Sequence, residues 1–506
     1  MTGHSHEHSH PVESNLGPLG DKLRSGALGI ALLGLLVAIG FTAYAVNTGQ
    51  DDGIRRFSLA YLAAFGFALS LGLGGLFFVF IQHLTRAGWS VLVRRLAEAM
   101  ASNFLVLAIL FVPIAGSVLW GNGMLYPWAQ PLTAAVIHHK PRIPLLTPEI
   151  AEAVAPAAPV TAAQDKSHGK PAATAADKSH DTTKAAAAID DAAEDAGHQR
   201  IRYEGGVAGR EPDHHHHPHK TLDALTLKKR SWLNPEFFVI RWIAYFVIWG
   251  FLGWYFWKNS VKQDGSGDPL LTRKMEKLAA PAAFVFGLTL TFASWDLLMS
   301  LNPHWFSTIF GVYYFAGSVI ATMATLILLV VGLQKAGVLT KEINVEHRHD
   351  LGKLMFAFTF FWGYIAFSQY MLLWYASLPE TTGWLSDRGA TTVTENLTPW
   401  CTVAIVLLFG HFLIPFPCLL SRHVKRHPLA LPFFACWMLV MHAVDMWWIV
   451  MPELGPDKIA IGPIEIGLMA FVVGSFFAGV FHRLTKQSLV PTHDPRVSES
   501  LAFQNL

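Results

Sequence analysis

Long apolar runs alternate with short polar segments along most of this 506-residue chain. Each run has about 20 residues or more, which is the length that a helix needs to cross the hydrocarbon core of a membrane. We count ten such runs, at residues 26–46, 57–82, 99–121, 236–257, 279–301, 306–333, 352–378, 399–420, 429–451 and 462–482. The pattern predicts an all-α polytopic membrane protein with ten transmembrane helices, whose even number places both termini on one side.

Lysine and arginine residues gather in the segments that follow the even-numbered runs. Examples are Arg94, Lys262, Lys341 and Arg422. The alternate segments hold few cations, although Arg55 and Arg56 are exceptions. The positive-inside rule therefore predicts that both termini are cytoplasmic, and that the junction of runs five and six opens on the other face.

The predicted helices divide the chain into five parts. These are a His-rich cytoplasmic tail at 1–25, helices one to three at 26–122, a long periplasmic excursion at 123–235, helices four to ten at 236–486 and a cytoplasmic tail at 487–506. The middle of the excursion is rich in Ala, Asp, Lys and Thr and has almost no large apolar residue, so we expect it to be largely disordered. Its histidines, like those of the first tail, could bind a metal or form a solvated tract.

The composition agrees with a membrane protein, with 52% hydrophobic and 15% charged residues and a mean hydropathy of +0.36. The net charge of +2 gives no basis for a nucleic-acid partner. Three cysteines, Cys401, Cys418 and Cys436, lie in apolar runs without a haem-attachment or iron–sulfur spacing. We therefore expect no redox centre and no dedicated metal site in the chain.

Ionisable residues inside the runs are the main candidates for function, because each is costly in a membrane unless it is paired or hydrated. His442 and Asp445 are three residues apart and share one helix face, where they could pass protons or clasp two helices. His411, before a pair of prolines, could join them or could bond a backbone carbonyl. With Glu465 near the outer face, these residues could form a ladder for protons.

A second group lies nearer the predicted outer face. Asp296 precedes the short junction of runs five and six, where it could take a proton or bond a neighbouring helix end. His304 lies in the junction itself. Gln369, Tyr370 and Tyr375 could contact a quinone ring, although an aromatic belt would also place tyrosine there.

Three segments together resemble a known family. They are WDLLMSLNPHWFSTIFG at 295–311, FSQYMLLWYASLPE at 367–380 and HAVDMWWIVMP at 442–452. These segments are similar to the ActF-type membrane subunit of alternative complex III, a bacterial quinol:cytochrome c oxidoreductase. The resemblance covers the ten-helix body but not the His-rich tail or the excursion.

The resemblance implies a fold like that of the NrfD-like membrane subunit of polysulfide reductase. In that fold, helices two to five and six to nine form two four-helix bundles, with one flanking helix at each end. The implied location is the bacterial inner membrane. Implied ligands are a quinone such as menaquinone and lipids. Implied partners are a paralogous ten-helix quinol-binding subunit, an iron–sulfur subunit, multihaem and monohaem cytochrome c subunits, small membrane subunits and a terminal oxidase.

The sequence is compatible with three functions. The chain could support quinol oxidation in a respiratory or photosynthetic complex, with Asp296 and His304 as proton acceptors and His411, His442 and Asp445 as conduits, because quinol loses two protons with its two electrons. It could instead be a structural scaffold that docks the quinol-binding subunit. A secondary transporter predicts matching broken helices in two halves, yet only run eight has a mid-span proline pair.

Overall fold

The computed structural model describes residues 15–49, 52–131, 224–390, 398–457 and 459–505. The chain divides into two compact units, and the described residues all belong to the unit formed by 1–131 and 222–506. The described part contains helices and no strand. Both His-rich tracts and the middle of the predicted excursion lie outside the described residues.

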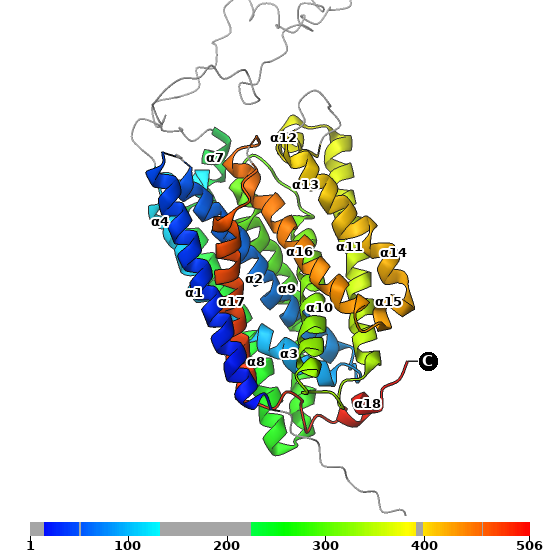
Figure 1. The fold of residues 1–506 in the computed structure, drawn as a ribbon. Coiled ribbons are helices and arrows are strands. Elements are labelled where there is room, and N and C mark those ends of the chain that lie inside the picture. The colour runs from blue at the N-terminus through cyan, green and yellow to red at the C-terminus, as the bar shows by residue number, and fades with distance from the viewer. Residues whose placement is uncertain (1–14, 50–51, 132–223, 391–397, 458, 506) are drawn as a thin grey trace, which may run out of the picture. The chain divides into compact units, whose positions relative to one another are not determined.

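Within the described residues, ten helices are long and apolar enough to cross a membrane, which confirms the predicted fold class (Figure 1). The unbroken spans are α1 (Gly17–Asn47), α2 (Gly53–Leu84), α8 (Pro235–Ser266), α10 (Phe310–Lys335), α11 (Val345–Ala376) and α17 (Pro463–Thr485). The others are α3 with α4 (Val91–Ala101 and Phe104–Trp120), α9 with the 3-10 turn η4 (Pro269–Leu297 and Met299–Leu301), α13 with η6 and α14 (Trp400–Leu407, Leu408–Leu413 and Pro415–Leu420), and α16 with η7 (Ala430–Val450 and Met451–Leu454).

Shorter helices lie at the span ends. They are η1 (Pro127–Ala129), α7 (Ala224–Lys228), η3 (Lys229–Ser231), α12 (Pro379–Asp387), α15 (Arg422–Arg426) and α18 (Val497–Leu501). We call the end where α9 joins α10 the hairpin end, and the end where α1 begins and α17 finishes the tail end. The two ends are distinct in the structure, but which of them faces the cytoplasm stays a prediction.

The spans pack as two four-helix bundles with a flanking pair. The first bundle contains α2, α3 with α4, α8 and α9, and the second contains α10, α11, α13 with α14, and α16. Helix α2 joins the bundles, because it also packs against α10 and α16. Between Arg56 and Gln82 it is apolar on nearly all sides, as expected for a helix at the centre of a bundle.

Helices α1 and α17 lie side by side along most of their length (Figure 1). Gly34 permits this contact, because a Cβ atom there would lie only 2.4 Å from the carbonyl oxygen of Gly467. Close approach of backbones through small residues is a common way to join helices in a membrane, where hydrophobic burial gives little drive. The pair then packs through α17 onto α2.

Both ends of the predicted excursion pack on the hairpin end of the first bundle. The hydroxyl of Tyr126 donates to the carbonyl of Leu297 at 2.8 Å, and the indole of Trp128 donates to that of Ser300 at 3.0 Å. The segment that contains α7 and η3 contacts the α9–α10 junction through Lys229, whose Nζ donates to the Pro303 carbonyl at 2.5 Å. The excursion therefore starts and finishes as ordered structure.

The C-terminal segment, 486–505, lies across the tail end of both bundles. Arg94 of α3 is buried, and it bonds Asp494 of this segment at 2.5 Å and Glu98 at 3.0 Å. Burial by itself raises the pKa of Asp494, but the Arg94 guanidinium outweighs this and holds that pKa below its ordinary value. Farther along, Asn505 donates to Glu346 of α11 at 3.0 Å, so one segment bonds both bundles.

Candidate functional site

A buried polar cluster lies in the second bundle where it meets α2. It contains three of the residues singled out from the sequence, His411, His442 and Asp445, which are at most 1% exposed. The ring centres of the two histidines are 6.4 Å apart. The structure thus brings together residues from η6 and α16 that the sequence could only place as successive members of a ladder.

Two hydroxyl groups complete this cluster, and the sequence reasoning missed both. Ser70 Oγ of α2 lies 2.9 Å from His442 Nε2, and the Tyr313 hydroxyl of α10 donates to Asp445 Oδ1. Serine and tyrosine are common in apolar helices, so neither residue stood out in the chain. The cluster accordingly includes side chains from both sides of the contact between the bundles.

A π-helical turn positions His411. In a regular α-helix the ring of Pro415 would clash with the His411 carbonyl, and proline has no N–H to bond it. Directly before this proline, the Ile414 N–H bonds the carbonyl of Phe409, five residues back, at 2.9 Å. The Trp437 indole donates to the Gly410 carbonyl at 2.7 Å, so α16 bonds a carbonyl of the wide turn. Such turns are frequent at functional sites.

Aromatic and glycine residues fix the two imidazoles. Trp362 of α11 stacks on His411 with ring centres 4.0 Å apart. Gly317 of α10 leaves room for His442, because a Cβ atom there would lie 2.8 Å from its Cε1 and 3.0 Å from its Nδ1. Both rings are therefore held tightly between helices.

Three imidazole nitrogens in this cluster have no hydrogen-bond partner within the described residues. They are Nδ1 of His442 and both ring nitrogens of His411. A buried polar group without a partner costs about 1–3 kcal/mol, and proteins usually satisfy such groups with internal water. These nitrogens have the chemistry to bond internal water and to exchange protons with it.

The cluster contains groups that can both take and release a proton. Imidazole has two nitrogens for this purpose, and a carboxyl group and a phenol can each serve as donor or acceptor according to their protonation. The contacts of Ser70 with His442 and of Tyr313 with Asp445 also tie three helices together. Both roles, proton transfer and the joining of helices, use the same atoms.

Glu465, the fourth residue of the predicted proton ladder, lies apart from this cluster. Its two carboxylate oxygens accept from Arg56 Nε at 2.6 Å and Nη2 at 2.8 Å, which joins α17 to α2 at the hairpin end. No hydrogen bond in the described part links it to Asp445. A continuous ladder from Glu465 therefore stays a prediction.

Asp296 is buried and fully hydrogen bonded. Arg241 of α8 donates from Nε and Nη2 to its two oxygens, both at 2.8 Å, while Tyr245 and Trp232 donate at 2.9 and 3.0 Å. We call these four residues the Asp296 clasp. Arg241 is the sixth residue of the apolar run 236–257, and an arginine inside such a run indicates a buried carboxylate partner. The sequence prediction missed this signal.

The other predicted quinone contacts do not gather around Asp296. His304 is exposed in the junction, and Gln369 is buried, where it accepts from the Ser307 hydroxyl at 3.0 Å. Tyr370 is half-buried, and Tyr375 is 83% exposed at the end of α11. Their part in a quinone site stays a prediction.

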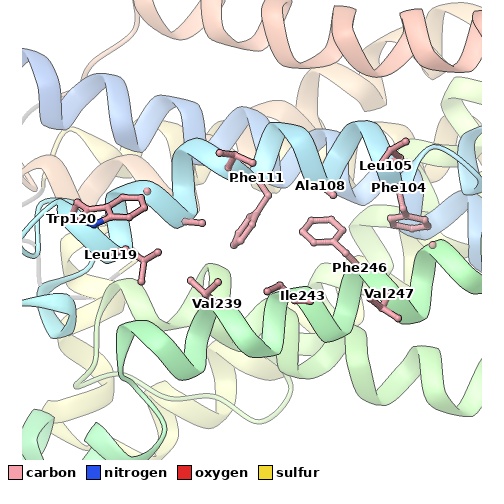
Figure 2. A pocket seen from close by; sticks show the side chains of 14 residues that line it. Phe104, Leu105, Ala108, Phe111, Leu119, Trp120, Val239, Ile243, Phe246 and Val247 are labelled. Atoms are coloured by element: carbon pink, nitrogen blue, oxygen red, sulfur yellow. The ribbon is translucent and has the colours of Figure 1, made fainter.

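Two of the cavities in the described part open on the spans. One of about 530 Å³ lies between α4 and α8, and the side chains that line it, such as Phe111, Phe246 and Ile243, include no ionisable group (Figure 2). The other, of about 480 Å³, lies at the hairpin end between η3 and the α9–α10 junction. Neither is lined by His411, His442 or Asp445.

These features define a ten-span membrane protein with a buried, partly unbonded polar cluster. A comparison with protein-family models gave no match, and a comparison with curated proteins gave none either.

Proposed function

We propose that the chain is an integral membrane subunit of a bacterial quinol:cytochrome c oxidoreductase of the alternative complex III type, and that it conducts protons without a redox cofactor of its own. The observation that carries the proton role is the buried cluster of His411, His442 and Asp445 with its three unbonded nitrogens. The resemblance of its motifs to the ActF-type subunit supports the assignment to this type of complex.

Quinol loses two electrons and two protons and becomes quinone, so the complex must give the electrons to one chain of centres and the protons to bases. Iron–sulfur and haem groups in partner subunits would take the electrons. In this chain, the Tyr313 and Asp445 pair would exchange a proton with His442, and His411 would be the neighbouring carrier.

A structural scaffold is the second candidate. The bonds from Ser70 to His442 and from Tyr313 to Asp445 favour it, because each joins two helices. A scaffold requires these bonds but requires no proton movement. The two candidates therefore differ in what removal of one carboxyl group does to turnover.

The decisive experiment uses the purified assembly with Asp445→Asn, which keeps the shape of the side chain and removes its carboxyl group. We expect turnover of quinol and cytochrome c to fall about 100-fold, as for loss of a general acid or base, with loss of proton yield. Subunit content must match the unmodified assembly.

Asp457→Asn is the matched control, because Asp457 is exposed at the hairpin end shortly after the same helix. It should leave turnover and proton yield unchanged. Unchanged turnover and proton yield in Asp445→Asn would remove this carboxyl group from the mechanism and leave the scaffold as the better account.

A further inference from the structure

The cavity between α4 and α8 is suited to a hydrocarbon chain. Its volume is about 530 Å³, and it is lined by residues within 104–120 of α4 and 239–250 of α8. Phe111 and Phe246 lie between the two helices (Figure 2). Apart from the Trp120 indole nitrogen at the hairpin end, no lining side chain has a polar atom. A polar group of a ligand would therefore lose its hydrogen bonds to water inside this cavity.

The cavity comes within reach of the membrane surface at the tail end. Gly250 is the last lining residue of α8, and the apolar run 236–257 finishes seven residues later. Lys258 is the next residue after this run, about 12 Å from Gly250 along the helix, so it lies at the level of the headgroups. One leaflet contributes about 15 Å of hydrocarbon. An acyl chain whose headgroup lies at Lys258 therefore reaches the cavity.

Five exposed cations lie at this level of the membrane, on the hairpin that α8 and α9 form at the tail end. The two helices are antiparallel and are joined by the short turn 267–268, so cations at equal distances from the turn lie at equal depth. The cations are Lys258, Lys262, Arg273, Lys274 and Lys277. Among the described residues, none of the five has a carboxylate within ion-pair distance.

The carboxylates of the same hairpin are bonded elsewhere. Asp264 accepts from Arg95 at 2.8 Å, and Glu276 accepts from Arg496 at 2.5 Å. Asp268 caps α9, because its side chain accepts from a backbone N–H of the first turn at 2.9 Å. The exposed side of the hairpin therefore has an excess of positive charge and suits an anion.

Trp254 lies between the cationic level and the cavity. It is four residues from both Gly250 and Lys258, so the three residues share one face of α8. The Lys258 ammonium lies 4.5 Å from the centre of the Trp254 ring. This ring is 49% exposed, and tryptophan is typical of the interface between headgroups and hydrocarbon. A cation, an interfacial ring and an apolar cavity thus follow one another in the order of the parts of a phospholipid.

We propose that the tail-end half of this cavity binds an acyl chain of an anionic phospholipid whose phosphate lies at Lys258 and Lys262. The cations of α9 add to the positive field at the same level. The unpaired cations support this ligand over a zwitterionic lipid, and the apolar lining supports an acyl chain over a quinone ring. The inference goes beyond the proposed function and does not depend on it.

The test is a lipid titration of the full-length protein in detergent, with native mass spectrometry as the readout. The probes are phosphatidylglycerol and phosphatidylcholine with identical chains, and the measured quantity is the affinity of the first bound lipid. We expect phosphatidylglycerol to bind more tightly, and Lys258→Gln with Lys262→Gln to weaken it roughly 25-fold, since each lysine near a membrane surface contributes about a fivefold factor. The affinity for phosphatidylcholine should stay the same.

The control for charge is Lys335→Gln with Lys341→Gln. These lysines are exposed at the tail end of the second bundle, so the change removes the same charge from the same end of the protein. It should leave the affinity for both lipids unchanged. Equal weakening by the two lysine pairs, or equal affinity for the two lipids, would overturn the proposal.

Gly250→Phe tests the cavity while it keeps every charge. A Cβ atom at Gly250 meets nothing within 4 Å, so the larger side chain fits without a shift of the backbone. We expect both lipids to bind about tenfold more weakly or less, since loss of a few buried methylene groups is enough for this. Gly287→Phe on α9 is the control, because its Cβ position is equally open and lies outside the cavity lining. Unchanged affinity in Gly250→Phe would contradict an acyl chain in the cavity.

Three other occupants would give different results. Displacement of the lipid by millimolar inorganic phosphate would identify a site for free anions. A naphthoquinone with an isoprenoid tail that binds more tightly than the lipid, with an affinity unaffected by the lysine changes, would identify a quinone site. Loss of a subunit from the purified assembly in Gly250→Phe, with lipid affinity unchanged, would identify a partner helix in the cavity. Each of these results would contradict the lipid assignment.

Discussion

Two buried polar groups in the membrane-spanning part differ in how completely they are bonded. In the Asp296 clasp, each carboxylate oxygen accepts two hydrogen bonds, and the arginine charge is matched by the aspartate charge. In the cluster of His411 and His442, three nitrogens have no partner within the described part. The Asp296 clasp therefore has the bonding of a structural contact between helices, whereas the histidine cluster has nitrogens available for proton exchange.

Substitutions in these two groups should have different effects. Removal of one partner from a buried ion pair leaves an uncompensated charge, which is among the most costly changes in a protein. Removal of a side chain that makes no hydrogen bond within the protein loses no such bond. Substitutions in the clasp should therefore act mainly on folding, and substitutions in the cluster mainly on proton movement.

The largest effect should come from Arg241→Gln, which leaves the Asp296 carboxylate buried without its cation. We expect the free energy of unfolding to fall by about 3–5 kcal/mol. An unfolding titration with a denaturing detergent in mixed micelles measures it. The double change of Arg241→Gln with Asp296→Asn should recover much of this loss, because no charge is then buried. A single-variant loss below about 1 kcal/mol would contradict the role given to the clasp.

A smaller effect should come from Gly317→Ala, which pushes the His442 ring away from α10. The added methyl group meets the ring at 2.8 Å, and such overpacking costs about 1–3 kcal/mol. The same titration, with proton yield measured on the assembly, would show both consequences. Gly332→Ala on the same helix is the control, because a Cβ atom there has nothing within 4 Å. Equal results for the two glycines would show that His442 needs no fixed position.

The smallest effect on stability should come from His411→Leu, because it removes two unbonded nitrogens and one stacking contact with Trp362. We expect the free energy of unfolding to change by less than about 1 kcal/mol while proton yield is lost. His442→Leu should cost about 1 kcal/mol more, since His442 is bonded to Ser70. A strong loss of stability in His411→Leu, with proton yield intact, would identify this histidine as structural.

The ten spans were predictable because their apolar runs are long enough to need a membrane, and the helices of the structure overlap every run. The helices extend past several runs, as α8 does through Lys258 and Lys262 to Ser266, because a helix remains favourable where charged side chains reach the headgroups. Periodicity also placed His442 and Asp445 on one helix face. Short-range sequence patterns are thus sufficient to predict the helices and the residues that share one helix face.

Long-range partners were not predictable from the same pattern. Arg241 and Asp296 are 55 residues apart, and Ser70 and His442 are 372 residues apart. The order of residues by depth in the membrane predicted Glu465 next to Asp445. The direction of the Glu465 side chain depends on how α17 packs, however, and in the structure Glu465 bonds Arg56. The proline pair indicated a distorted helix but did not specify a π turn.

The bond between Arg94 and Asp494 has a consequence for biogenesis. The two residues are 400 positions apart, and at about 5–20 residues per second the ribosome needs roughly 20–80 s to supply the second after the first. Throughout that interval, the newly inserted α3 lacks one of the carboxylates that its arginine requires. A residue translated 400 positions later therefore completes a joint of α3, and a chain that stops before residue 494 gives quality-control proteases an arginine without that carboxylate.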